Sequence, residues 1–224
     1  MSLFEKKSIR LFSVTALYIC LLSTSILILI KNTHHYDHSK KAPVKTFITN
    51  EVRTLSNLSK IRDAQQQYRT IDWNNDNVKS FAQFNAHLWQ TVDKFSYPVE
   101  SRLLSKKLAF AIGPTKAVSG YFFEPIYYKM TQQKESIETN SNADSQDENK
   151  ELIDYVNEWA VAAFPARYQT TGVLTFIIHA TGNIYAKDVK SEQVKYLPDN
   201  YISKGWSKIS GKADIEALHM QKKN

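Results

Sequence analysis

The sequence predicts an α+β protein in which one transmembrane helix precedes a long helix packed on an antiparallel sheet of three to four strands. Three observations predict this fold. Residues 11–30 form an apolar run without a charge, residues 48–68 repeat apolar side chains every three or four positions, and aromatic and β-branched runs follow from residue 121 onwards. With 224 residues, the chain is long enough for one such domain.

The apolar run at residues 11–30 is predicted to be a single membrane anchor. A helix of this length spans roughly 30 Å, the thickness of the hydrocarbon core of a bilayer. The sequence from Lys31 to His35 offers no small-residue cleavage site, which favours an uncleaved anchor over a secretory signal. Although basic residues also follow the run, Lys6, Lys7 and Arg10 favour a cytoplasmic N-terminus at residues 1–10 and a periplasmic domain.

Charge and cysteine content exclude several classes of protein. The net charge is +7, but residues 1–45 hold seven basic and two acidic side chains, which leaves 22 basic and 20 acidic ones for the rest. A basic face for nucleic acid is therefore not expected on the folded domain. Cys20 is the one cysteine and lies in the apolar run, so neither an intrachain disulfide nor a Cys-x-x-Cys motif can form.

The periplasmic domain is predicted over residues 46–210, after a linker at 31–45 and before a tail at 211–224, where a frayed helix is allowed. Asn50 is a candidate N-cap with Glu51 in the first turn, and the apolar stripe extends this first helix to about Tyr68. A shorter helix is expected around residues 80–89. The segment 131–150 has almost no large apolar side chain and is predicted to be a mobile loop.

The rest of the domain is predicted to form the sheet. Strands are expected over residues 121–130, 155–164, 172–178 and 184–189, with Pro125 marking an edge or a bulge. The last two strands flank Ala180-Thr181-Gly182-Asn183, where the glycine can supply the positive φ of a hairpin turn.

Short motifs in this part of the chain follow one another in a fixed order. They are Pro165-Ala166-Arg167-Tyr168, then Gly172-Val173-Leu174-Thr175-Phe176, then Gly182-Asn183-Ile184-Tyr185-Ala186-Lys187-Asp188. Together they resemble a family of exported bacterial proteins classed only as a domain of unknown function, over roughly residues 50–190. The resemblance implies no established activity.

The layout also looks like the globular head of type II secretion pseudopilins and type IV pilins. The features that carry this likeness are Ala64-Gln65-Gln66-Gln67-Tyr68 on the long helix and Gly120-Tyr121-Phe122-Phe123 at the first strand. The resemblance implies a pilin-like head. The glycine and the glutamate of a pilin processing site are absent from residues 10–16, so assembly into a pilus is not implied.

The sharpest local motif is Asp72-x-Asn74-x-Asp76, whose oxygens match positions 1, 3 and 5 of a calcium-binding loop. Asn77 stands where such a loop needs glycine, and Gln83 where it needs a bidentate glutamate. The sequence therefore allows a weak calcium site at most, and no other cofactor is expected. The alternative is an Asx-rich turn that ends the helix.

Catalytic motifs are missing from the sequence. His87, His179 and His219 lie far apart along the chain, and no nucleophile elbow, phosphate loop or zinc-ligand spacing is present. No catalytic residue is assigned for these reasons. A cleft that holds His179 with a carboxylate within about 3 Å would favour the enzyme alternative.

Aromatic side chains on the first predicted strand suggest a binding surface. If the long helix covers only one face of the sheet, an exposed binding face forms on the other; its residues would be Tyr121, Phe122, Phe123, Tyr127 and Tyr128. The alternative is that the mobile loop predicted at residues 131–150 shields this face.

These observations predict a membrane-anchored, non-enzymatic interaction or accessory protein of the bacterial cell envelope, with its folded domain in the periplasm. The expected partners are the inner membrane and another envelope protein, and nucleic acid is not one of them. A hydrolase with a dispersed site and a weak calcium-binding module are the alternatives.

Overall fold

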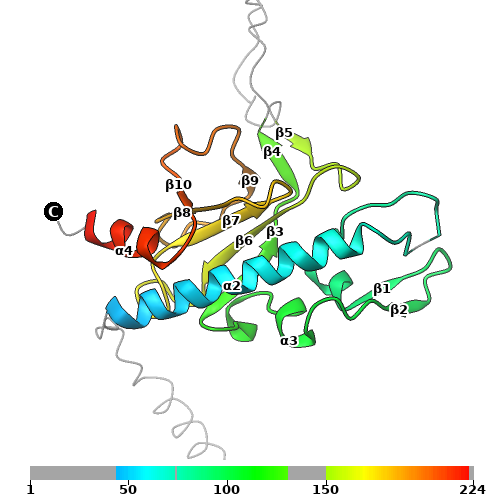
Figure 1. The fold of residues 1–224 in the computed structure, drawn as a ribbon, viewed down its shortest axis with the longest axis horizontal. Coiled ribbons are helices and arrows are strands. Elements are labelled where there is room, and N and C mark those ends of the chain that lie inside the picture. Colours follow the sequence, from blue (N-terminus) through cyan, green and yellow to red (C-terminus); the bar gives the residue numbers. More distant parts are fainter. Residues whose placement is uncertain (1–43, 74, 131–149, 222–224) are drawn as a thin grey trace, which may run out of the picture. The chain divides into compact units, whose positions relative to one another are not determined.

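The computed structural model describes residues 44–73, 75–130 and 150–221, in which helix α2 packs on one face of a five-stranded sheet (Figure 1). The predicted anchor at residues 11–30, its cytoplasmic flank and most of the linker lie outside the described residues, as does most of the predicted loop at 131–150. Within the described ranges, no helix is both long and apolar enough to cross a membrane.

Helix α2 covers Val44–Tyr68 and ends where the apolar stripe predicts. Its buried face includes Phe47, Leu58, Ile61 and Tyr68, which recur at the three- and four-residue spacing of a helix. The predicted N-cap is wrong because the helix begins six residues before Asn50. The Asn50 amide instead donates to the carbonyl oxygen of Thr171, at 2.8 Å, and ties the helix to the loop before β7.

The main sheet is antiparallel throughout, in the order β10-β8-β7-β6-β3. Its strands are β3 (Tyr121–Pro125), β6 (Ala160–Pro165), β7 (Thr175–His179), β8 (Ile184–Lys187) and β10 (Ser207–Ile209). The predicted turn between the third and the fourth predicted strands connects β7 to β8, and Gly182 in it has φ +78°. Glycine suits this position because a Cβ atom disfavours positive φ.

Shorter elements surround the main sheet. Before β3 the chain forms η1 (Asn85–Leu88), β1 (Gln90–Val92), β2 (Pro98–Glu100), α3 (Lys106–Ala109) and η2 (Pro114–Lys116). A second small sheet has the order β5-β4-β9, with β4 (Tyr128–Met130), β5 (Lys150–Leu152) and β9 (Tyr196–Leu197). Helix α4 (Lys212–Gln221) lies beside the N-terminal half of α2, whereas the β1–β2 hairpin lies near its other end (Figure 1).

Both faces of the main sheet are buried. On the helix side, Tyr121, Phe123, Phe176 and Ile178 pack with the apolar face of α2. On the opposite side, a second cluster is built from Phe122, Ala160, Ala162, Phe164, Ile177 and Trp206, and is covered by side chains between residues 185 and 206. The sheet is therefore the middle layer of the domain.

The predicted pilin-like arrangement of a long helix on a sheet of three to four strands is wrong. Among the described residues there are ten strands in three sheets, and the largest sheet has five strands. Six of the ten strands have only two or three residues. Five of these six, all except β4, were not predicted, because such short segments show no alternation of apolar and polar residues.

Two further elements differ from the expectation. The predicted helix at residues 80–89 is a single 3₁₀ turn, Asn85–Leu88. The predicted strand at 121–130 is two strands in different sheets. The Ile126 amide still donates to the carbonyl oxygen of Ala160 on β6, whereas from Tyr128 the chain pairs with β5 and β9.

Candidate functional site

Three sites in the described structure each contain one of the histidines that the sequence leaves unassigned. His87 lines a pocket near the C-terminal end of α2, His179 lines a pocket at the end of β7, and His219 on α4 contacts a buried carboxylate of α2. The two pockets are open to a ligand, whereas the third site is enclosed.

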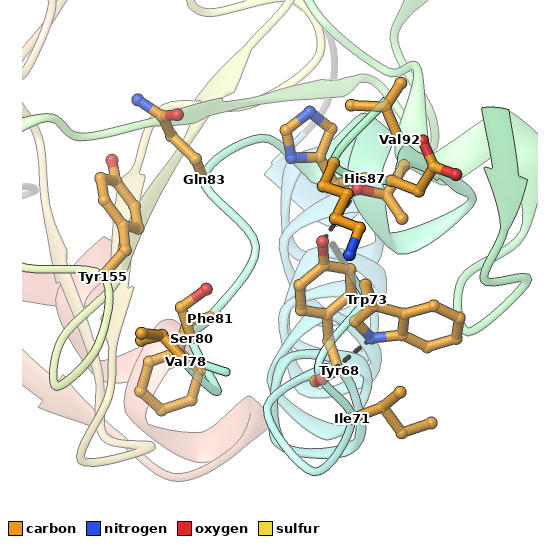
Figure 2. Close-up of a pocket in the computed structure, with 13 residues that line it drawn as sticks. Tyr68, Ile71, Trp73, Val78, Ser80, Phe81, Gln83, His87, Val92 and Tyr155 are labelled. Atoms are coloured by element: carbon orange, nitrogen blue, oxygen red, sulfur yellow. Dashed lines mark hydrogen bonds between the residues drawn. The ribbon is translucent and has the colours of Figure 1, made fainter. Parts of the chain in front are cut away.

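The first site is a pocket of about 330 Å³, here called the aromatic pocket, and its walls include Tyr68, Trp73, Phe81, His87, Val92 and Tyr155. Figure 2 shows Phe81 and Tyr155 on one side of the opening and Tyr68, Trp73 and His87 on the other. The volume lies at the lower end of the range for small-ligand sites. The pocket can therefore hold a small molecule or a side chain of a partner.

Polar contacts from α2 hold the walls of the aromatic pocket in place. The buried Gln65 amide donates to the Ala82 carbonyl at 2.9 Å and accepts from the Ala82 amide at 2.8 Å. The Tyr68 and Thr91 hydroxyl oxygens lie 3.0 Å apart, which fixes strand β1. The Trp73 indole donates to the Tyr68 carbonyl at 3.0 Å. The pocket is therefore formed before any ligand binds.

The titratable rings of the aromatic pocket are neutral near pH 7. Burial lowers the pKa of His87, so its imidazole presents one donor and one acceptor nitrogen. Burial, with a smaller effect of Tyr127, raises the pKa of Tyr155 to about 12. The oppositely charged Asp93 and Lys94 also line the opening. Together these groups favour a neutral, largely apolar ligand.

Exposed apolar side chains surround this opening. Ile71, Val78 and Val92 line it and are 43–48% exposed. Phe84 packs edge-on against the His87 ring, and the hairpin tip beyond Lys94 carries two further aromatic side chains. Thirteen large apolar side chains are exposed among the described residues, and six of them lie between residues 71 and 97: Ile71, Val78, Phe84, Val92, Phe95 and Tyr97. These six are called the apolar rim below.

The second site, here called the hairpin pocket, has a volume of about 390 Å³ and is lined by Asn157, Glu158, Trp159, His179, Ala180, Thr181 and Leu197. The Thr181 hydroxyl lies 3.2 Å from Nε2 of His179. Glu158 accepts from the Lys129 ammonium at 2.7 Å. Over the described residues, no carboxylate is within hydrogen-bond distance of the His179 ring. This pocket therefore lacks the histidine–carboxylate pair that would favour the hydrolase alternative.

The third site is built around Glu51, which is fully buried in α2. One carboxylate oxygen accepts from the backbone amides of Val173 and Leu174, both at 3.0 Å. The other lies 2.6 Å from Nε2 of His219, whose side chain is 9% exposed. Because no substrate can reach an enclosed carboxylate, this site holds the fold together.

The family-like motifs meet at this buried carboxylate. The Tyr121 hydroxyl donates to the Leu174 carbonyl at 2.8 Å, and burial followed by the charge of Glu51 raises the pKa of Tyr121 well above its usual value. Gly172 packs against the Tyr121 ring so closely that a Cβ atom at this position would lie 2.6 Å from Cζ of the ring. The Gly-Tyr and Gly-Val motifs are therefore parts of one packing arrangement.

The predicted aromatic binding face does not form on β3. Tyr121, Phe122 and Phe123 are at most 7% exposed, because successive residues of the strand face two covered sides of the sheet. Tyr127 is half-buried between two strands, and Tyr128, on β4 of the small sheet, is 41% exposed. The second face of the sheet is covered, but by side chains between residues 185 and 206. Most of the loop at 131–150, which the sequence alternative named as the cover, lies outside the described residues.

The predicted calcium motif lies in the loop after α2. The Asp72 carboxylate accepts from the backbone amides of Asp76, at 3.2 Å, and Asn77, at 2.8 Å. Asn74 lies outside the described residues. In the described part of the motif, the contacts of the Asp72 carboxylate are those of an Asx-type turn, in which an Asp or Asn side chain bonds to nearby backbone amides. The described part of the chain contains no group of three or more potential metal-ligating residues of the His, Cys, Asp or Glu type.

We expect millimolar calcium to leave the thermal unfolding midpoint of the full-length protein unchanged, because backbone amides already occupy the Asp72 carboxylate. The measurement is a pair of melting curves with calcium and with magnesium. A calcium-specific rise in the midpoint that the Asp72→Asn variant loses would contradict this expectation, since a ligand that binds only the folded state raises its stability.

These features define a single α+β domain that buries a structural carboxylate and opens two pockets. Residues 44–208 match the family described as "Protein of unknown function (DUF2950)", and the chain belongs to this family. The predicted membership in a family of unknown function is thereby confirmed, and the family match gives no support to the resemblance to pilins. Neither a curated protein nor a solved structure matches the chain.

Proposed function

We propose that this domain is a non-enzymatic interaction module of the cell envelope, which binds another envelope protein through the aromatic pocket and the apolar rim. The concentration of six exposed large apolar side chains around one preformed pocket is the observation that carries the proposal. Contiguous exposed apolar surface of this kind is typical of protein-binding sites. The envelope location is part of the proposal and rests on the sequence of residues 11–30, outside the described residues.

The occupant that suits the pocket is an apolar or aromatic side chain of the partner. Aromatic walls and neutral rings favour such a side chain over a charged one. Phe95 and Tyr97, each 68% exposed at the hairpin tip, extend the contact area beyond the pocket. In a typical protein interface, a side chain of one partner fills a pocket of the other, and the contacts around the pocket exclude water.

Site-specific photo-crosslinking in intact cells tests this proposal. A photoreactive phenylalanine analogue at Phe95 is expected to give a discrete crosslinked species, whereas the same analogue at Ile202 is not. The two positions are matched, because Phe95 is 68% and Ile202 is 66% exposed, and only the first belongs to the apolar rim. Equal crosslinking from both positions would contradict the proposal.

A charge placed in the pocket lining is expected to remove the crosslink. Ile71→Asp should reduce the crosslinked species from position 95 by about tenfold or more, since a desolvated unpaired carboxylate is costly. Ile112→Asp is the matched control, because Ile112 is 45% exposed compared with 48% for Ile71 and lies outside the pocket lining. If both variants keep the crosslink while melting like the parent protein, the pocket is not the binding site.

A further inference from the structure

The hairpin pocket lies on a rigid part of the main sheet, separate from the lining of the aromatic pocket. Ala160 on β6 pairs with His179 on β7, and the Ala180 amide extends this ladder by donating to the Trp159 carbonyl at 3.1 Å. Residues 157–159, the start of the turn after β7 and strand β9 thus meet around one opening. A ligand there would contact side chains whose backbone is fixed by strand pairing.

The lining of the hairpin pocket contains both polar and apolar side chains. Asn157, Glu158, His179 and Thr181 supply hydrogen-bonding groups, and Trp159, Ala180 and Leu197 supply apolar surface. The Asn157 amide nitrogen donates to Asp154 at 2.7 Å, so the planar amide group is held in one orientation. Such a lining favours a small ligand that carries many hydrogen-bonding groups and also presents C–H groups to the apolar side chains.

The charges around the hairpin pocket are compensated. Glu158 is the acidic residue of the lining, and its carboxylate is paired with Lys129 at 2.7 Å. Burial lowers the pKa of His179, and the nearby Glu158 offsets this only in part, so the imidazole is neutral near pH 7. No lysine or arginine is among the described residues that line the pocket, so an anion has no cationic group to pair with there.

A buried hydrogen-bond donor at this site lacks an acceptor. Trp159 lines the pocket and is 1% exposed, and its indole N–H is unpaired in the described structure. An unsatisfied buried donor costs about 1–3 kcal/mol, so such groups are rare and require a reason. The nitrogen itself is enclosed, so a ligand in the pocket would reach it only after neighbouring side chains move.

We propose that the hairpin pocket binds a neutral, hydroxyl-rich small molecule, namely a saccharide unit. Sugar hydroxyls both donate and accept hydrogen bonds, which suits the amide, carboxylate, imidazole and hydroxyl groups of Asn157, Glu158, His179 and Thr181. The carbon-bound hydrogen face of a sugar ring suits the apolar surface of Ala180 and Leu197, which are half-buried. This site is independent of the apolar rim.

The test is a titration of the full-length protein with N-acetylglucosamine, followed by saturation-transfer NMR and by tryptophan fluorescence. Saturable binding in the millimolar range is expected. His179→Phe keeps a ring for the stack on Tyr201, whose centroid is 5.3 Å away, and removes the ring nitrogens. It should weaken binding about threefold to tenfold, the effect of one lost hydrogen bond. Asn157→Ala, at an exposed position, should do the same.

Ile71→Asp is the control that separates this inference from the proposed function. It should leave sugar binding unchanged, because Ile71 lines only the aromatic pocket. The absence of saturation at tens of millimolar sugar would overturn the inference. Binding that neither His179→Phe nor Asn157→Ala weakens would overturn it as well, and so would binding of inorganic phosphate at the same residues in place of the sugar.

Discussion

Replacing Glu51 by alanine is expected to destabilise the domain by about 3–5 kcal/mol, because it removes the acceptor of several buried hydrogen-bond donors. The substitution leaves the Val173 and Leu174 amides and the His219 ring without their acceptor in a closed part of the core. Each buried unpaired donor adds its own desolvation cost. Urea unfolding followed by circular dichroism measures the change in the free energy of unfolding.

Two further variants separate the parts of this effect. Glu51→Gln keeps an oxygen acceptor for the backbone amides and should destabilise less than Glu51→Ala. Glu216→Gln is the control on α4, because it removes an exposed ion pair with Lys212, and it should cost at most about 1 kcal/mol. A Glu51→Ala protein that unfolds like the control would show that the buried carboxylate contributes little.

Gly172→Ala is expected to cost about 3 kcal/mol or more and to lower the yield of folded protein. The added Cβ would overlap the Tyr121 hydroxyl and lie 2.6 Å from Cζ and 2.7 Å from Cε2 of the same ring. Tyr121 is fully buried, so the ring has no free space to move into. Overpacking at a rigid site usually costs about 1–3 kcal/mol, and here the overlap is with the body of the ring.

A matched substitution shows whether the effect belongs to the site. Gly211→Ala adds the same methyl group where no atom lies within 4 Å, and it should change the stability by less than about 1 kcal/mol. Tyr121→Phe removes the hydroxyl overlap together with the hydrogen bond to the Leu174 carbonyl, so it should cost less stability in the Gly172→Ala background than in the parent protein. Equal melting midpoints for Gly172→Ala and Gly211→Ala would contradict the packing argument.

Local patterns in the sequence predicted those elements whose cause is local. The apolar stripe up to Tyr68 predicted α2, and the Thr181-Gly182-Asn183 segment predicted the β7–β8 turn. The covering of the second sheet face could not be predicted, because it is assembled from short, mostly polar segments between residues 185 and 206. For that reason the aromatic residues of β3 read as an exposed face although both sides of the strand are buried.

The sites depend on contacts between distant residues, and the sequence carried little signal for them. Glu51 was interpreted as a first-turn acid that stabilises a helix dipole, yet its partners come from residues 121, 173, 174 and 219. No local pattern marks a buried acid whose partners are so distant along the chain. The aromatic pocket likewise joins the end of α2 to β1 and to Tyr155. His87 and His179 were noticed in the sequence, but their surroundings only emerged from the fold.

The position of α4 limits how the protein can be dissected. The family match ends at residue 208, whereas the contact of His219 with Glu51 lies eleven residues beyond that boundary. An expression fragment trimmed to the family boundary would also cut through β10 and would lack Ile215, which is fully buried in the core, so the apolar side chains that pack against Ile215 would be exposed. Recombinant fragments of this chain should therefore extend at least to residue 221, because the part of the chain that packs together is longer than the family match.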